Sequence, residues 1–190
     1  MHAIIRAVSP SLGQCELTHL ERQMIEVALA CRQHEAYAQC LAALGCTLIH
    51  LPAEPALPDA VFVEDTAVVL DEVALITRPG APSRRPETAS VAAVLAAHRP
   101  VQAILAPGTL DGGDVLCLGR RLYIGLSSRS NRAAIQQMAH LLTPWGYSVC
   151  GVRVDGCLHL KSAVTQVADD LLLLRSEERR VGKECRSRWS

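Results

Sequence analysis

Apolar positions in this chain fall into short runs and into longer stretches with helical spacing. The short runs predict strands at residues 3–8, 46–51, 66–70, 73–77, 101–105, 115–118, 122–125, 147–154, 163–167 and 171–174. Helical spacing predicts helices at residues 18–45, 86–98 and 130–142. Thr18 suits the N-cap of the first helix, because Glu21 occupies the capping-box position and Gly45 suits the end. Pro86 suits the first turn of the second helix.

The middle of the chain repeats an order of strand, strand, helix and strand. The repeat has a period of about 48 residues, so that Ile76 matches Ile124 and Val101 matches Val149. The last two predicted strands begin a third unit. A repeat of this length indicates stacked or radial units, and the period alone does not fix their number.

The end of the chain differs from the rest. Residues 175–190 hold six basic and three acidic side chains with almost nothing to bury, and the change comes directly after the apolar run Leu171–Leu174. A charged, solvated tail or a nucleic-acid-binding arm is one interpretation. The segment instead resembles an in-frame translation of a common sequencing adapter, and such segments are set aside from fold reasoning. We therefore expect one partial domain at residues 1–174 and a non-native tail at 175–190.

Charge and hydropathy limit the classes of partner that the chain is expected to bind. The whole chain is neutral, and without the tail it has 13 basic and 16 acidic side chains, a net charge of −3. No basic field is left to favour nucleic acid or anionic lipid. No apolar run approaches the roughly 20 residues of a membrane helix, and residues 1–6 lack the pattern of a secretory signal. We expect a cytoplasmic protein that binds neither nucleic acid nor membrane.

Seven cysteines precede the tail, and none forms a CxxC pair. A structural zinc site is therefore improbable, and reduced thiols are expected. Cys157 lies two residues before His159, so both could share a strand face. A spectator thiol remains the favoured interpretation of Cys157.

Four segments carry candidate chemistry. Residues 110–115, Leu-Asp-Gly-Gly-Asp-Val, place two acids in a glycine-rich turn, and residues 156–162 bring a histidine about 45 positions later. Residues 59–65 hold three acids, and residues 77–85 hold three arginines. We expect Gly112 and Gly113 to adopt backbone conformations closed to other residues. Acids beside a histidine are typical of a site that binds a cation and transfers a proton.

Together these four segments closely resemble dimethylarginine dimethylaminohydrolase, a guanidino-group-modifying family of the pentein superfamily. The resemblance covers roughly residues 1–174, in the family's order. It implies an α/β fold, a pentein-type propeller of ββαβ units with five blades around a central channel, of which about three are present here. It also implies hydrolysis of Nω,Nω-dimethylarginine, or of the monomethyl form, to citrulline and dimethylamine or methylamine, without cofactor or metal.

A substituted guanidinium is hard to hydrolyse because it stays protonated, with a pKa above ~12. Carboxylates must orient it, a thiolate must attack its central carbon, and an acid must protonate the departing amine. By resemblance, His159 is the acid and later activates water, and Asp111 holds His159, a task that Asp114 could also perform. The expected substrate contacts are Leu17 over the bound molecule, Asp59, Glu64 and Asp65 on the guanidinium, and Arg84 and Arg129 on the amino-acid end.

The family's nucleophilic cysteine lies near its C-terminus, in a segment that this chain lacks. We therefore expect the chain as printed not to turn over, and its partial ring to fold poorly because strand edges are left open. Alternatives are another pentein reaction such as arginine deimination, a non-catalytic binder of cationic amino acids and, less probable, a metal-binding protein. In animals the family suggests nitric oxide regulation, and in a microbe nitrogen catabolism. The oligomeric state is left open.

Overall fold

The computed structural model describes residues 1–18 and 21–175. Of the expected tail only Arg175 is described, and residues 176–190 lie outside the described residues. None of the described helices is long and apolar enough to cross a membrane.

Two units of the repeat have the same topology. In the first, β3 (Ala67–Val69) pairs antiparallel with β4 (Ala74–Ile76), and β5 (Val101–Ala103) pairs parallel with β4 after helix α2 (Thr88–Leu95). The second unit repeats this order with β6 (Val115–Leu118), β7 (Arg121–Leu126), α3 (Arg132–Leu142) and β8 (Ser148–Arg153). The pairs Ala67–Ile76 and Val115–Ile124 are offset by 48 residues, as the sequence pattern predicts. The predicted ββαβ repeat is thus present in the backbone register.

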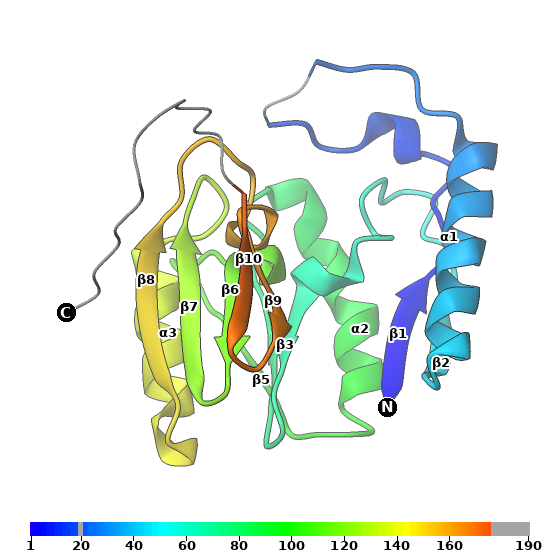
Figure 1. Ribbon diagram of the computed structural model, residues 1–190. Coiled ribbons are helices and arrows are strands. Elements are labelled where there is room, and N and C mark those ends of the chain that lie inside the picture. The colour runs from blue at the N-terminus through cyan, green and yellow to red at the C-terminus, as the bar shows by residue number, and fades with distance from the viewer. Residues whose placement is uncertain (19–20, 176–190) are drawn as a thin grey trace, which may run out of the picture.

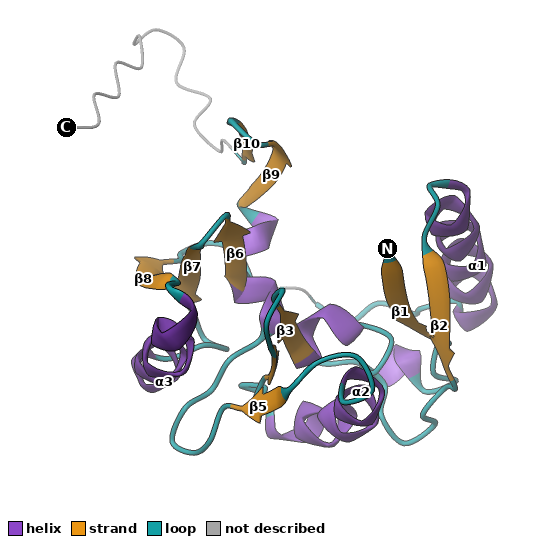
Figure 2. Ribbon diagram, turned by 90° about the horizontal axis from the view of Figure 1, so that it is seen from below, coloured by secondary structure: helices purple, strands orange, loops and turns teal. Residues whose placement is uncertain are grey.

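The two ends of the described chain are parts of further units. At the N-terminus β1 (His2–Arg6) pairs parallel with β2 (Thr47–Leu51), and helix α1 (Val27–Ala43) connects them. At the other end β9 (Val164–Ala168) and β10 (Leu171–Leu174) form an antiparallel hairpin. Figure 1 shows the elements in chain order, and Figure 2 shows the four small sheets following an arc with α1, α2 and α3 on its outer side.

The largest part of the core lies between the two complete units. Leu75 of β4 and Ile124 of β7 are almost fully buried in one cluster with Met138 and Leu142 of α3. Helix α3 presents these side chains on one face, and the side chain of Asn131 caps its first turn by accepting the N–H of Ala134 at 3.0 Å. Burying each such side chain contributes roughly 1.5–3 kcal/mol, so adjacent units are held in a fixed arrangement.

The start of the first helix differs from the prediction. Helix α1 begins at Val27, and residues 21–26 are not helical. Thr18 does not cap it, because its hydroxyl instead accepts a hydrogen bond from the guanidinium of Arg129 at 3.0 Å. The backbone N–H of Glu16 is likewise taken by the carboxylate of Asp59. Contacts with distant residues therefore outweigh the local capping signal.

The second helix is also shorter than predicted. A 3-10 segment, Pro82–Glu87, comes first and contains Pro86, so that α2 begins only at Thr88 and ends at Leu95. This segment places the side chains of Arg84 and Glu87 inward, where both are buried. The remaining strands and the third helix lie within two residues of their predicted bounds.

Candidate active site

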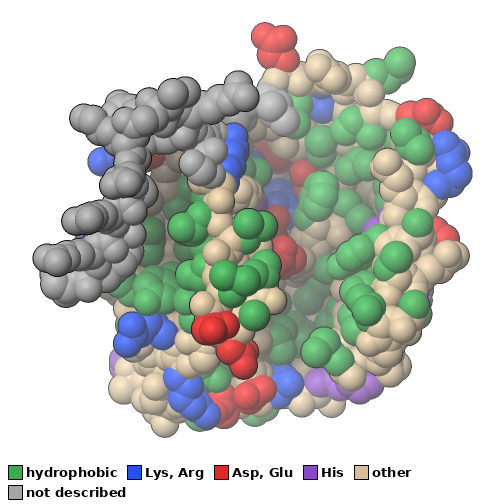
Figure 3. Space-filling view, viewed as in Figure 1, with side chains coloured by type: hydrophobic (Ala, Val, Ile, Leu, Met, Phe, Trp, Pro, Cys, Tyr) green, Lys and Arg blue, Asp and Glu red, His purple; other side chains and the backbone are tan. Residues whose placement is uncertain are grey.

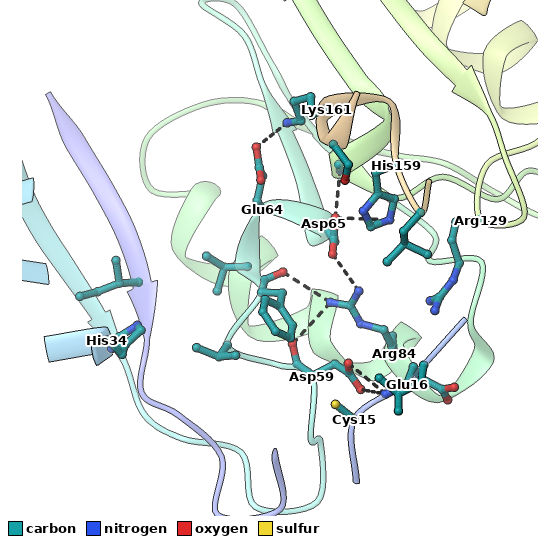
Figure 4. Close-up of a pocket in the computed structure, with 18 of the residues that line it drawn as sticks. Cys15, Glu16, His34, Asp59, Glu64, Asp65, Arg84, Arg129, His159 and Lys161 are labelled. Atoms are coloured by element: carbon teal, nitrogen blue, oxygen red, sulfur yellow. Dashed lines mark hydrogen bonds and ion pairs between the residues drawn. The ribbon is translucent and has the colours of Figure 1, made fainter. Parts of the chain in front are cut away.

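Three short 3-10 turns carry the central residues of the site, and each leads into the first strand of a unit. They are Val63–Thr66 before β3, Gly112–Asp114 before β6 and Leu160–Ser162 before β9. Because the units repeat, the three turns lie at the same end of their respective sheets, and they come together there. Figure 4 shows Asp65, from the first of these turns, and His159, which directly precedes the third, facing each other in a pocket.

His159 contacts the carboxylate of Asp111. The distance between Nε2 of His159 and Oδ2 of Asp111 is 3.2 Å, and Oδ1 of Asp65 lies 4.0 Å from the same nitrogen. Burial disfavours the charged imidazole, but the Asp111 hydrogen bond and the charges of Asp65, Asp114 and Asp111 outweigh it, and the pKa of His159 is raised above its usual 6.5. The ring is thus biased toward the protonated form that can act as an acid.

Asp111 is fixed on several sides and is fully buried. Its Oδ1 accepts the backbone N–H of Gly80 at 2.9 Å, and its own N–H donates to the hydroxyl of Ser130 at 3.1 Å. Asp114, the other candidate partner, does not contact the imidazole ring by a hydrogen bond. Its carboxylate instead accepts the N–H of Leu160 at 2.9 Å.

Gly112 and Gly113 are required for space and not for backbone conformation. Neither has a positive φ, which corrects the expectation from the sequence. A Cβ on Gly113 would lie 2.7 Å from Nδ1 of His159 and 2.8 Å from Oδ1 of Asp65. A Cβ on Gly112 would lie 2.0 Å from the carbonyl oxygen of Glu64. The two glycines allow the turns of adjacent units to approach closely.

Arg84 lies in the pocket with its guanidinium already paired. It donates to Oδ2 of Asp65 at 2.8 Å and to both carboxylate oxygens of Glu87, at 3.1 and 2.9 Å. Burial acts against the charge, but the hydrogen bond with Glu87 and the charges of Asp65 and Glu87 prevail, and the pKa of Arg84 is raised above its usual value. Arg84 therefore fixes the orientation of the Asp65 carboxylate and also lines the pocket.

Arg129 is buried and incompletely paired. Its Nη2 donates to Thr18, and its Nη1 lies 3.8 Å from Oδ2 of Asp111. Among the described residues Nη1 has no hydrogen-bond partner. A buried guanidinium nitrogen without a partner carries a free-energy cost, which an anionic ligand group in the pocket would remove.

The remaining predicted residues line the same pocket. Asp59 is buried, and burial raises the pKa of its carboxyl although the N–H of Glu16 and the charge of Arg84 act in the opposite direction. Glu64 is exposed and is paired with Lys161, so that its carboxylate points away from Asp65 in Figure 4. Leu17 is about two-fifths exposed at the rim, with a relative exposure of 38%.

The pocket encloses about 660 Å³ and brings together most of the residues predicted from the sequence. Its lining includes Leu17, Asp59, Glu64, Asp65, Arg84, Arg129 and His159. Asp111, which contacts His159, is fully buried and is not part of this lining. Figure 3 shows a hollow whose margins are formed by hydrophobic side chains, with charged side chains at depth.

Sequence reasoning missed several residues that complete this site. Glu87, which pairs with Arg84, was hidden in a predicted helix start, although its spacing of three residues from Arg84 is typical of a helical ion pair. Ser127 and Ser130 bind Asp114 and had no distinguishing signal. Thr18 was assigned to a cap instead of to Arg129.

One oxygen or nitrogen each of Asp65, Asp111 and His159 lie within 4.8 Å of one another, a spacing that a metal ion could use. Nη1 of Arg84 stands 2.8 Å from Oδ2 of Asp65 and 4.0 Å from Oδ2 of Asp111. Arg129 lies 3.8 Å from Oδ2 of Asp111 as well, so both carboxylates already face cationic side chains. This arrangement favours an ion-pair network over a cation site.

Comparison with known proteins shows the family of the chain. A family model described as N,N dimethylarginine dimethylhydrolase, eukaryotic, matches residues 14–183. The dimethylarginine dimethylaminohydrolase of Streptomyces coelicolor is 45% identical over 172 residues, which cover 90% of this chain and 67% of that protein. The chain belongs to the dimethylarginine dimethylaminohydrolase family. The family's enzyme from Pseudomonas aeruginosa is 36% identical over 93% of this chain and 70% of its own length.

Solved structures of the family share the fold. A cysteine-to-serine variant of the dimethylarginine dimethylaminohydrolase from Pseudomonas aeruginosa, complexed with citrulline, superposes with a TM-score of 0.88 over 93% of this chain and 69% of that one. The N-terminal domain of the arginine dihydrolase ArgZ, at 19% identity and a TM-score of 0.78, shares the fold alone. The expected pentein-type α/β fold is confirmed. The chain spans about two thirds of the length of these family members.

Proposed function

We propose that this chain carries the substrate-binding and proton-transfer parts of a dimethylarginine dimethylaminohydrolase. The enzyme would hydrolyse Nω,Nω-dimethylarginine or the monomethyl form to citrulline and dimethylamine or methylamine. The observation that carries the proposal is the His159–Asp111 pair, 3.2 Å apart at the side of a pocket that also contains buried carboxylates and the partly unpaired Arg129. The family's named relatives support the choice of substrate.

The pocket has complementary ends for a methylated arginine. Asp59 and Asp65 offer carboxylates to a guanidinium, and a charge-assisted hydrogen bond contributes about 1.5–3 kcal/mol. Nη1 of Arg129 can donate a hydrogen bond to the substrate's carboxylate. Leu17 lies at the rim, where it can cover the bound molecule. Glu64 would reach the substrate only after its contact with Lys161 is broken.

Proton transfer would be assigned to His159. A thiolate adds to the guanidino carbon, and the protonated imidazole donates its proton to the departing amine nitrogen as the C–N bond breaks. The neutral imidazole then removes a proton from water, which attacks the same carbon and releases the thiolate and citrulline. Asp111 stabilises the imidazolium in the first state and fixes the ring in both.

None of the described cysteines is placed as the nucleophile. Cys15 is the described cysteine that lines the pocket, and it is buried. The thiol of Cys157 contacts the backbone carbonyl of His159 at 3.3 Å and not the ring. We propose that the attacking thiolate belongs to the part of the family's length that this chain does not span, and that residues 175–190 are not native. The cytoplasmic location expected from the sequence stays a prediction.

A direct test measures both binding and turnover by the 190-residue chain. We expect isothermal titration calorimetry to detect citrulline and dimethylarginine, and Arg129→Ala to weaken both about tenfold or more because the carboxylate loses its partner. An exposed arginine, Arg132, supplies the matched control as Arg132→Ala. Failure of either ligand to bind a folded chain would contradict the proposal.

Turnover separates the competing functions. We expect no release of dimethylamine by the 190-residue chain, and release from dimethylarginine by the same chain extended to the family's full length. Release of ammonia from arginine in preference would favour a deiminase. A non-catalytic binder of cationic amino acids is favoured by the absence of a suitably placed thiol among the described cysteines, and it would be supported if the extended protein bound dimethylarginine without hydrolysing it.

A further inference from the structure

Asp114 makes contacts that the proposed reaction does not use. Its side chain is fully buried at the end of the Gly112–Asp114 turn. Oδ2 accepts hydrogen bonds from the hydroxyls of Ser127 at 2.6 Å and Ser130 at 2.7 Å. Oδ1 accepts the backbone N–H of Leu160 at 2.9 Å. Three donors compensate a buried carboxylate for its lost hydration.

The two serines extend this contact to the loop that carries Arg129. The hydroxyl oxygen of Ser127 accepts the backbone N–H of Arg129 at 3.0 Å and that of Ser130 at 3.2 Å. The hydroxyl oxygen of Ser130 accepts the N–H of Asp111 at 3.1 Å. Each serine therefore donates to Asp114 and accepts from the backbone of a site residue or its neighbour.

The third contact of Asp114 reaches the turn that carries His159. Leu160 follows His159 directly, so its N–H fixes the backbone from which the imidazole projects. Gly125 leaves room for this approach, because a Cβ there would lie 2.6 Å from Oδ1 of Asp114 and 3.1 Å from Cβ of Leu160. The carboxylate thus touches two adjacent units of the fold.

We propose that Asp114 is a positioning residue that fixes the Arg129 loop and the His159 turn relative to each other. The group that would bind the substrate's carboxylate and the group that would protonate the leaving amine are then held at a fixed separation. The role of this fixed separation in substrate binding and proton transfer rests on the proposed function. The link through Asp114 is itself a property of the fold.

An asparagine cannot replace this carboxylate. Its amide offers one oxygen and one NH₂ donor, while all three partners of Asp114 are donors. If the NH₂ faced Ser127, it would meet a hydroxyl oxygen whose two lone pairs already accept backbone N–H groups. If it faced Leu160, two N–H donors would oppose each other. Asp114→Asn preserves shape and size but breaks the network in either orientation.

The pKa of His159 gives a second readout of the replacement of Asp114, one that does not depend on ligand binding. The charges of Asp65, Asp111 and Asp114 act on the ring. Arg84 and Arg129 lie 4.0 and 3.8 Å from Oδ2 of Asp111, and Lys161 is paired with Glu64. The carboxylate of Asp114 is one of the charges that raise the pKa of His159. Replacing it with an amide removes that charge and loosens the turn, so the pKa of His159 falls.

The test compares Asp114→Asn and Ser127→Ala with Ser90→Ala in the 190-residue chain. Ser90 is the matched control, since its hydroxyl also donates to a carboxylate, that of Glu54, at 2.8 Å and outside the pocket lining. Circular dichroism establishes folding, NMR titration follows His159, and calorimetry measures citrulline. We expect Asp114→Asn to lower the pKa of His159 and weaken citrulline at least about fivefold, and Ser127→Ala to weaken citrulline with little change in the titration. Ser90→Ala should change neither.

A double-mutant cycle tests the linkage directly. Asp114 acts through Arg129 if adding Asp114→Asn to the Arg129→Ala variant weakens citrulline binding further by less than about twofold. Independent multiplication of the two effects, or an unchanged His159 titration in a folded Asp114→Asn variant, would overturn the proposal. If Asp114→Asn does not fold, Ser127→Ala and Ser130→Ala decide in its place. If the unmodified chain binds no citrulline, the proposed function fails, and the linkage is then decided by whether Asp114→Asn shifts the backbone NMR resonances of both the Arg129 loop and the His159 turn.

Discussion

His159 is held by carboxylates from two turns of the fold, and its protonation is therefore tied to stability. Asp111 contacts the ring and Asp65 lies 4.0 Å from it, while the ring itself is largely buried. A charge-assisted hydrogen bond of this kind contributes about 1.5–3 kcal/mol. The imidazolium is consequently more stable in the folded protein than in the unfolded chain.

This tie predicts a pH dependence for His159→Gln. Because the folded pKa is raised above 6.5, the stabilising contribution of His159 is fully present below about pH 6.5 and is lost as the pH rises through the folded pKa. We expect the free energy of unfolding to fall by about 1–3 kcal/mol in the variant at pH 5.5, and by less at pH 9. Urea denaturation at both pH values measures this. An equal loss at both would contradict the assignment.

Gly113 predicts a second residue-scale effect. A Cβ at this position would crowd both His159 and Asp65, so Gly113→Ala should destabilise the fold by about 1–3 kcal/mol and weaken citrulline binding. Gly13→Ala is the control, because nothing lies within 4 Å of its Cβ and its φ is not positive. Thermal melting and calorimetry on both variants check the difference. Comparable effects of the two substitutions would show that proximity is not the cause.

Among the secondary-structure elements, helix α3 joins the two complete units. Met138 is fully buried between the sheet of its own unit and strands of the preceding one. We expect Met138→Ala to cost about 2–5 kcal/mol, because it leaves a cavity at this junction. Gln136→Ala, on the exposed side of the same helix, should change stability by less than about 0.5 kcal/mol. Chemical denaturation measures both.

Sequence patterns predicted the strands well because their apolar runs coincide with buried or paired segments. Leu122 and Ile124 are apolar in the pattern and fully buried in β7. The same reasoning placed the first helix too early, because a capping signal at Thr18 cannot reveal that Arg129, distant in the chain, takes its hydroxyl. It also could not foresee Glu87, whose burial depends on a 3-10 segment. Local patterns therefore predicted elements better than the contacts between them.

In the whole molecule, apolar side chains of the last described hairpin face outward. All four leucines of β10 are exposed, with Leu174 at 66% and Leu173 at 62%. Such a surface on a short hairpin is a site for self-association. The sequence-based expectation that this chain folds poorly is consistent with it and stays a prediction.

The exposed leucines of β10 predict that a charged side chain placed among them will reduce self-association. We expect Leu173→Lys to reduce light scattering at a given protein concentration without lowering the melting temperature, since the leucine buries little. The same substitution at the buried Leu122 should abolish folding. Unchanged scattering by Leu173→Lys would show that β10 is not the associating surface.

The repeat has a consequence for how the site responds to the rest of the molecule. Asp111 and His159 are separated by 48 residues, as are Asp65 and Gly113, whose N–H donates to Oδ1 of Asp65 at 2.9 Å. Both contacts join equivalent regions of successive units and neither lies within a unit. A change in the angle at either junction would alter the contact that crosses it. Ligand affinity would then be thermodynamically linked to the curvature of the arc, because the residues that line the pocket come from successive units.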